Sequence, residues 1–179
     1  MDFAKVLAEI ARFLEGEGAR FGLAGAIALN AHGLARATTD LDLVVDECAQ
    51  PALLRHLALL GYEQLYVSAG YSNHLHPQAA WGRLDFIYLD LQTADRLFAR
   101  AIRQRPFSGT EVSVPSPEHL AAMKVQAMKN APSRTFQELS DIQFLLGLPG
   151  VDEAEIRSYF LKQGLLGSFD ELKRNMAAD

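Results

Sequence analysis

The sequence predicts an α/β core followed by a helical C-terminal part. Two observations predict it. Short apolar runs typical of strands alternate with helical periodicity over the first 115 residues. Helical periodicity alone follows in the remainder of the chain. We therefore expect a core domain over residues 1–115 and a helical subdomain packed on it over residues 116–179.

Turn residues and periodicity place the elements of the first half. Asp2 is expected to cap the first helix, and Pro51 suits the first position of the third. Residues 68–82 carry Gly, Ser, Asn and Pro and are expected to form a loop, which makes His74 and His76 a polar loop pair rather than a metal site. The expected helices lie near residues 3–14, 26–32, 51–60 and 97–102. The expected strands lie near residues 20–24, 40–45, 62–67, 83–89 and 112–114.

The second half reads as a series of capped helices. Ser116 followed by Pro117 is a favourable helix start, and apolar stripes then continue to Leu146. Asp152 and Ser168 are expected to cap the last two helices.

Composition narrows the class of protein. Of the 179 residues, 49% are hydrophobic and 22% are charged, which is typical of a globular protein rather than a disordered one. The net charge of -5 gives no overall attraction for nucleic acid. The single Cys48 excludes an internal disulfide framework. The longest uncharged stretch, 21–35, is shorter than the roughly 20 residues of a membrane span, so we expect a cytoplasmic protein with no membrane contact.

The most informative segment is a pair of carboxylates on the second expected strand. Asp40 and Asp42 are two residues apart, so both point to one face of the sheet while Leu41 and Leu43 point to the other. Two such charges need solvent, a basic side chain or a divalent cation to stabilise them, and oxygen ligands of this kind suit Mg²⁺. A solvated surface pair is the alternative. Gly25 lies just before an expected helix, where free N–H groups favour a phosphate.

These carboxylates belong to a longer motif, G-x-x-R-x-T-x-D-x-D, preceded by a glycine and a short apolar helix. Its residues are Gly33, Arg36, Thr38, Asp40 and Asp42, with Gly25 upstream. Over about 20 residues, this pattern resembles the nucleotidyltransferase superfamily that includes DNA polymerase β. The nearest likeness is to small bacterial members similar to AbiEii-type abortive-infection toxins. The resemblance implies a mixed β-sheet flanked by helices, an NTP substrate and a two-metal site for Mg²⁺, or alternatively Mn²⁺.

The resemblance also implies roles for particular residues of the core. Asp40 and Asp42 would be joined as catalytic metal ligands by a third carboxylate on a later strand, for which Asp85 is the first candidate. Asp90 is the second candidate, although we expect it to cap a helix. The other residues implied at the phosphates are Gly25, Ala26, Arg36 and Thr38, with loop support as the alternative for the last two.

In the C-terminal part the resemblance is weaker. Lys124 would reach the triphosphate, with a surface lysine as the alternative. Asp141 would hold Lys124 or the core domain, with an exposed helix acid as the alternative. The chain departs from the family at Ala26, where relatives carry Gly or Ser, and at residues 134–138, where a basic residue is missing. Both changes bear on ATP affinity.

The resemblance thus predicts transfer of an NMP from an NTP to a hydroxyl of tRNA, a protein or a small molecule. It also implies a toxin–antitoxin or phage-defence setting with a cognate partner. The alternative is a regulatory or interaction module that retains the fold with weak catalysis. A glycosyltransferase with a D-x-D motif is a third reading, which leaves the upstream Gly, Arg and Thr unexplained.

Overall fold

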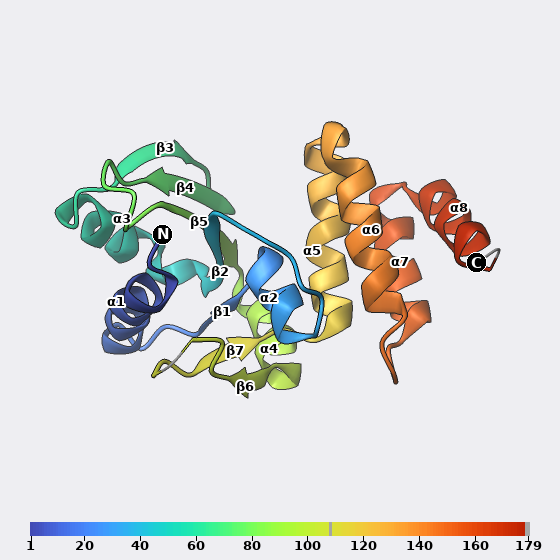
Figure 1. Ribbon diagram of the computed structural model, residues 1–179, viewed down its shortest axis with the longest axis horizontal. Coiled ribbons are helices and arrows are strands. Elements are labelled where there is room, and N and C mark those ends of the chain that lie inside the picture. Colours follow the sequence, from blue (N-terminus) through green and yellow to red (C-terminus); the bar gives the residue numbers. More distant parts are fainter. Residues whose placement is uncertain (108, 178–179) are drawn as a thin grey trace. The chain divides into compact units, whose positions relative to one another are not determined.

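The computed structural model describes residues 1–107 and 109–177. The chain forms two compact units, Met1–Pro115 and Ser116–Asp179 (Figure 1). In the part of the chain described, no helix combines the length and the apolar character that crossing a membrane requires.

The first unit is built on one mixed sheet. Within the described residues the sheet has seven strands, in the order β3-β4-β5-β2-β1-β7-β6. The strands are β1 (Phe21–Leu23), β2 (Asp40–Asp46), β3 (Glu63–Val67), β4 (Tyr71–Leu75), β5 (Arg83–Leu89), β6 (Ile102–Gln104) and β7 (Val112–Val114). The pairs β2–β5 and β1–β7 are parallel, and the other neighbours are antiparallel. The predicted fold class, a mixed sheet flanked by helices, is therefore confirmed.

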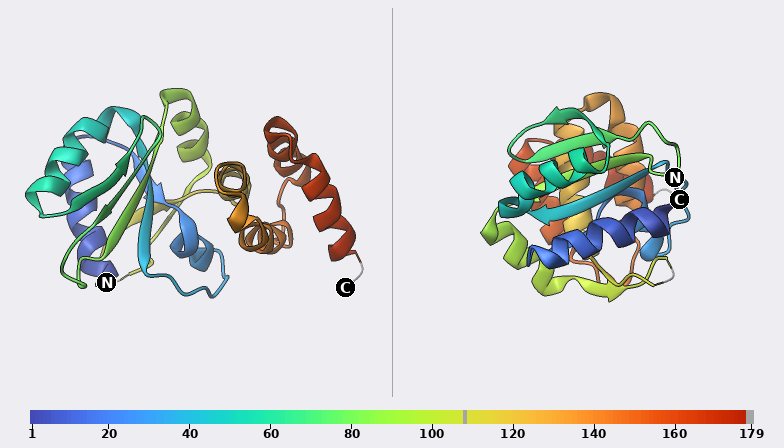
Figure 2. Two further views of the ribbon diagram at one scale, coloured as in Figure 1. Left: turned by 90° about the horizontal axis from the view of Figure 1, so that it is seen from above. Right: turned by 90° about the vertical axis from the view of Figure 1, so that its left-hand side faces the viewer.

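Helices lie on both sides of this sheet. They are α1 (Phe3–Gly16), α2 (Gly25–Ala31), the 3₁₀ helix η1 (Glu47–Ala49), α3 (Gln50–Leu59) and α4 (Leu91–Arg100). Helices α1 and α3 cover one face, and α2 lies on the other side (Figure 2). Helix α1 begins as predicted, because the Lys5 N–H donates to Asp2 Oδ1 at 3.1 Å and satisfies one free group of the first turn.

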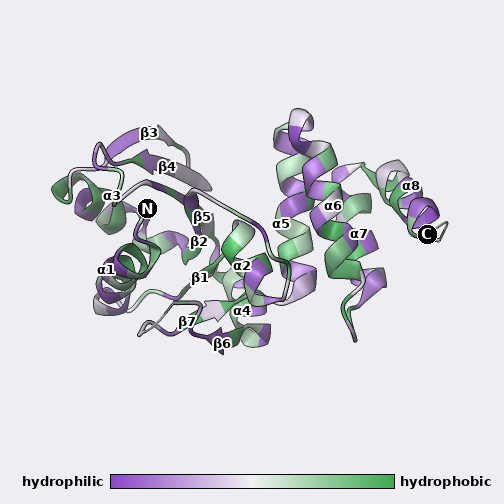
Figure 3. Cartoon of the chain, in the orientation of Figure 1, coloured by the Kyte–Doolittle hydropathy of each residue, from purple (hydrophilic) through white to green (hydrophobic). Residues whose placement is uncertain are grey.

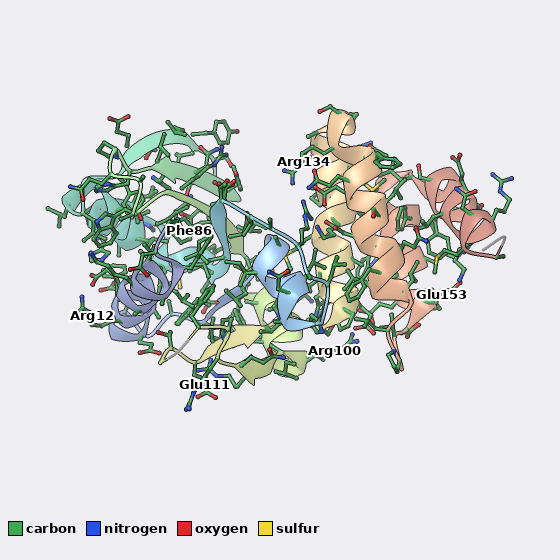
Figure 4. The ribbon with its side chains drawn as sticks, viewed as in Figure 1. Arg12, Phe86, Arg100, Glu111, Arg134 and Glu153 are labelled. Atoms are coloured by element: carbon green, nitrogen blue, oxygen red, sulfur yellow. The ribbon has the colours of Figure 1, made fainter. Side chains whose placement is uncertain are left out.

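The core lies between the sheet and its covering helices. Alternate residues of the two central strands are completely buried, among them Leu41, Leu43, Leu84 and Phe86. Phe86 is seen inside the unit, whereas Arg12 projects from its periphery (Figure 4). Because side chains alternate along a strand, the residues between these apolar ones point to the opposite face. That opposite face carries the acidic motif.

The second unit is helical. Its elements are α5 (Pro117–Asn130), the 3₁₀ helix η2 (Pro132–Arg134), α6 (Thr135–Leu146), α7 (Glu153–Gln163) and α8 (Leu166–Met176). Ser116 and Asp152 cap α5 and α7 as predicted. Hydrophilic and hydrophobic residues are mixed along each helix, as expected where one face is buried (Figure 3). The rings of Phe160 and Phe169 pack α7 against α8 with centroids 5.3 Å apart.

The predicted loop over residues 68–82 is wrong, because β4 lies within it. The inward-facing residues of this strand are Ser72 and His74, so the strand has no apolar alternation to reveal it. Their polar groups are satisfied in a buried chain, in which His74 Nε2 lies 2.9 Å from Ser72 Oγ, and Ser72 Oγ lies 2.7 Å from the Tyr88 hydroxyl. The two histidines are also buried rather than exposed in a loop, His74 at 2% exposure and His76 at 8%.

Two other predictions about element ends are wrong. Residue 102 begins β6 instead of ending a helix, since three residues of edge strand are too short to show a periodicity. Helix α8 begins at Leu166, with Leu165 at its N-cap, so Ser168 lies inside the helix and does not cap it.

Candidate active site

The two central strands bring the predicted carboxylates together. Parallel β2 and β5 pair in a register that sets Asp42 opposite Asp85 and Asp40 opposite Arg83. Residues directly opposite each other in neighbouring strands share a face of the sheet, and the strands lie about 4.8 Å apart. Asp40 is on the same face as Asp42 by alternation. Three carboxylates from two strands therefore gather on one face.

Gly25, the first residue of α2, lies against Asp42. Its φ is +55°, a conformation that favours glycine, and a Cβ built there would stand 2.0 Å from Asp42 Oδ2. The Ala24 N–H donates to the Asp42 carbonyl at 2.9 Å. Only a residue without a side chain lets the start of the helix approach the carboxylate this closely. The start of α2 is thus held beside Asp42, and the phosphate role of Ala26 stays a prediction.

Asp85 is mostly buried and hydrogen-bonded. Arg83 Nε donates to Asp85 Oδ1 at 3.0 Å, and the Asp85 side chain is 13% exposed. Burial raises the pKa of Asp85 above its usual value, hydrogen bonding from Arg83 and Tyr71 opposes the rise, and the charge of Asp40 adds to it. A carboxylate with a raised pKa is a stronger proton acceptor than an ordinary aspartate. The second candidate, Asp90, caps α4 as expected, with the Thr93 N–H donating at 2.9 Å.

The loop that leads into β2 is fixed by local hydrogen bonds. Asn30 clamps the backbone of Arg36 on both sides, since Asn30 Oδ1 accepts from the Arg36 N–H at 2.8 Å and Asn30 Nδ2 donates to its carbonyl at 3.1 Å. The Asp40 N–H donates to Thr38 Oγ1 at 3.2 Å, and Thr39 Oγ1 donates to Asp40 Oδ1 at 2.8 Å. These bonds fix the position of Asp40, the first carboxylate of the motif.

Arg36 and Thr38 also line a cavity of about 410 Å³. Its other walls are formed by Phe3, Ile27, Asn30, Ala31, Gln104, Pro106 and Phe107. Gly25 is not among the residues that line this cavity. The phosphate roles of Arg36 and Thr38 stay predictions.

In the second unit, Lys124 is enclosed by carboxylates. Its Nζ donates to Glu138 Oε2 at 3.0 Å and to Asp141 Oδ2 at 2.5 Å, with all three side chains under 10% exposed. Arg134 adds a second cation, 2.8 Å from Glu138 Oε1. Lys124 is thus not a surface lysine, and Asp141 is not an exposed acid. The role of Lys124 at a triphosphate stays a prediction.

Asp40, Asp42 and Asp85 define one face of the sheet, here called the acidic face. The residues on the acidic face fit a divalent cation. The donor set consists of carboxylate oxygens, the ligands that Mg²⁺ prefers, and the lack of a side chain at Gly25 leaves the space that the Asp42 carboxylate occupies. Within residues 1–107 and 109–177, no three His, Cys, Asp or Glu side chains are grouped closely enough to hold a metal ion as they stand. Because Asp85 is turned toward Arg83, its carboxylate has to shift partners to join Asp42 at a cation.

Three residues of this face escaped the sequence analysis. Arg83 hydrogen-bonds to Asp85, Tyr71 affects the pKa of Asp85, and Asn73 pairs with Asp85 in the antiparallel β4–β5 ladder. No signal pointed to Tyr71 and Asn73, because both fell in the expected loop. Arg83 is two residues before Asp85 on a strand. This spacing places both side chains on one face and could have indicated the pair.

Comparisons with known proteins agree with this fold. No family model matches the sequence, and no curated protein sequence matches it. The solution structure of the antibiotic-resistance factor ANT(2'')-Ia matches over 100% of both chains, with a TM-score of 0.65 and 11% identity. Its crystal structure with adenylyl-2''-tobramycin matches over 88% of this chain and 97% of that one, with a TM-score of 0.64 and 13% identity.

A further structure, of the lincosamide antibiotic adenylyltransferase LnuA with lincomycin bound, covers 80% of this chain and 96% of that one. Its TM-score is 0.53 and its identity is 17%. At these identities the likeness shows that the chain has the fold of nucleotidyltransferases. It does not show a particular activity or the toxin-like specificity expected from the sequence.

Proposed function

We propose that the protein is a Mg²⁺-dependent nucleotidyltransferase that moves an NMP from an NTP to a hydroxyl acceptor. One observation carries the proposal: the parallel register that sets Asp85 opposite Asp42, on the face that also carries Asp40. The fold shared with adenylyltransferases supports it. When bound, divalent cations would supply charge neutralisation at the triphosphate and at the attacking oxygen.

The residues of the acidic face would have different roles in the reaction. Asp40 and Asp42 would hold the cation that faces the triphosphate, and Asp85 would complete the second position. Asp85 would accept the proton of the acceptor hydroxyl as that oxygen attacks the α-phosphorus and pyrophosphate leaves. The backbone N–H groups of Gly25 and Ala26 would receive phosphate oxygens at the start of α2.

For the acceptor, we propose the hydroxyl of a small molecule. The similar structures name an adenylylated tobramycin and a bound lincomycin, which are small hydroxylated compounds. The net charge of -5 and the carboxylates of this face also disfavour a polyanionic acceptor such as tRNA. The alternatives are a tRNA or a protein hydroxyl, within a toxin–antitoxin or phage-defence setting.

A label-transfer assay tests this proposal. The protein is incubated with Mg²⁺ and each of the four NTPs radiolabelled at the α-phosphate. Separate reactions contain small hydroxylated antibiotics, tRNA or cell-extract protein. We expect label on a small molecule, with release of pyrophosphate. Label on RNA or protein instead would identify the alternative acceptors.

Two variants make the assay specific. Asp42→Asn keeps the shape of the side chain but removes its charge, and it should lower transfer by about 10³-fold. Asp95→Asn is the matched control, because Asp95 is an exposed carboxylate on α4 paired with Arg20. Absence of label with every NTP, together with calorimetric binding of Mg²⁺ and ATP, would favour the regulatory module. Equal transfer by Asp42→Asn would refute the assigned site.

A further inference from the structure

Asn73 extends the acidic face by one strand. It pairs with Asp85 across the antiparallel β4–β5 ladder, just as Asp85 pairs with Asp42 across the parallel β5–β2 ladder. Side chains directly opposite each other point to the same face, with Cβ atoms about 5 Å apart. Asp42, Asp85 and Asn73 therefore form one row across three neighbouring strands.

The amide oxygen of Asn73 is buried and has no hydrogen-bond partner among the described residues. Most buried polar atoms are paired, so an orphaned acceptor at a site calls for an explanation. Arg83 Nε, a donor on the same face, is directed at Asp85 Oδ1 at 3.0 Å and not at Asn73. The unpaired atom is therefore an oxygen lone pair next to Asp85.

We propose that Asn73 Oδ1 is an oxygen ligand of the divalent cation that lies between Asp85 and Asp42. The inference rests on the proposed function, because it concerns the cation position that Asp85 would complete. Amide carbonyl oxygens bind Mg²⁺, Mn²⁺ and Ca²⁺ alongside carboxylates. A neutral oxygen is well suited here, since a fourth carboxylate would add repulsion to a face that already carries three.

The charge of this face favours a cation over other ligands. Asp40, Asp42 and Asp85 bring three formal negative charges, and Arg83 is the cation hydrogen-bonded to the last of them. A group attracted to such a face is positive, and the atom that Asn73 offers accepts but does not donate. When Asp85 shifts from Arg83 to the cation, Asn73 Oδ1 on the adjoining strand would complete the ligand set on that side.

Binding of Mn²⁺ alone to the full chain tests the inference. Free Mn²⁺ is followed by electron paramagnetic resonance during titration of the wild type, Asn73→Leu and Asn73→Asp. We expect Asn73→Leu to weaken Mn²⁺ binding by about 10-fold or more. Its folded state without metal should be at least as stable as that of the wild type, because an unpaired buried oxygen has been removed. Asn73→Asp retains an oxygen and should bind Mn²⁺ at least as tightly.

The matched control is Gln64→Leu. Gln64 is an exposed amide on the adjacent β3, and it pairs with His74, which places it on the opposite face. We expect this variant to bind Mn²⁺ like the wild type. If Asn73→Leu fails to fold, the comparison of Asn73→Asp with the wild type decides, and weaker Mn²⁺ binding by Asn73→Asp would overturn the inference.

The outcomes separate this inference from the proposed function. If the wild type binds Mn²⁺ and Asp42→Asn loses it, while folded Asn73→Leu binds as tightly as the wild type, the role of Asn73 is refuted and the proposed function stands. If the wild type binds no Mn²⁺, both are overturned. If Asn73→Leu and Asp42→Asn both weaken binding and Gln64→Leu does not, the inference is supported.

Discussion

Two groups of charged residues in this chain differ in the balance between positive and negative charge. In the second unit, Lys124 and Arg134 face two buried carboxylates, so the charges cancel. On the sheet face of the first unit, three carboxylates come from two neighbouring strands, and one of them, Asp85, is paired with Arg83. A balanced group needs no further partner and joins α5 to α6. The carboxylates on the sheet face instead share one face at close spacing, an arrangement that a cation stabilises.

The largest effect should come from adding one methyl group at Gly25. Gly25→Ala would drive a Cβ to 2.0 Å from Asp42 Oδ2 and displace the carboxylate. We expect nucleotide transfer to fall by about 10³-fold, as when a major electrostatic contribution to catalysis is removed. Steady-state kinetics of label transfer measure it.

Gly18→Ala is the matched control for this substitution. Gly18 also has a positive φ, of +68°, but a Cβ there would meet nothing within 4 Å. Both variants should lose about 1–2 kcal/mol of unfolding free energy from backbone strain. Only Gly25→Ala should lose activity. Similar activities in the two variants would show that the approach of Gly25 to Asp42 has no functional role.

Removing the central cation of the second unit should have the next largest effect. Lys124→Met leaves Glu138 and Asp141 buried with one partner fewer, and we expect the unfolding free energy of this unit to drop by about 3–5 kcal/mol. Urea unfolding followed by helical circular dichroism measures it. If stability is unchanged and nucleotide transfer is abolished, Lys124 acts at the triphosphate and the contrast between the two groups is wrong.

A buried neutral group beneath the acidic face should give a smaller, pH-dependent effect. Burial lowers the pKa of His74 from its usual 6.5. Below about pH 6.5 the unfolded chain takes up a proton that the folded chain resists, so stability falls as the pH falls toward the folded-state pKa. The contribution of His74 is at most about 1.4 kcal/mol per pH unit, and it is absent above pH 6.5.

The His74→Gln variant isolates this contribution. Its unfolding free energy, measured from pH 8 to pH 5, should vary less steeply below about pH 6.5 than that of the wild type. Identical slopes in the two proteins would mean that His74 accepts a proton in the folded state and that the Ser72–His74 chain is not neutral.

An exposed ion pair of the second unit should give the smallest effect. Lys173 Nζ lies 2.8 Å from Glu153 Oε2, with side chains 36% and 50% exposed. Solvent screens such a pair, so Lys173→Ala should change the unfolding free energy by less than about 1 kcal/mol. A loss equal to that of Lys124→Met would show that burial does not distinguish the two ion pairs.

The sequence predicted those parts of the fold that depend on local chemistry. Asp2, Ser116 and Asp152 cap helices as expected, because capping depends on residues three positions apart. The carboxylates Asp40 and Asp42 were recognised from alternation along one strand. These signals need no knowledge of distant parts of the chain.

The rest depended on pairing between strands, which alternation alone does not reveal. Strand β4 was missed because its buried residues, Ser72 and His74, are polar and satisfy each other. Tyr71 and Asn73 were missed together with that strand, because only the β4–β5 register brings them to Asp85. The resemblance to a known family suggested Asp85 as the third carboxylate. Only the β2–β5 register shows that Asp85 is the neighbour of Asp42.

The location of a bound cation tests the central claim most directly. Crystals soaked with Mn²⁺ and an unreactive NTP analogue would be measured at a wavelength where manganese scatters anomalously. We predict an anomalous peak about 2.1 Å from carboxylate oxygens of Asp42 and Asp85, with Asp85 turned from Arg83. A structure with nucleotide bound, no peak on this face and Asp85 still hydrogen-bonded to Arg83 would contradict the account.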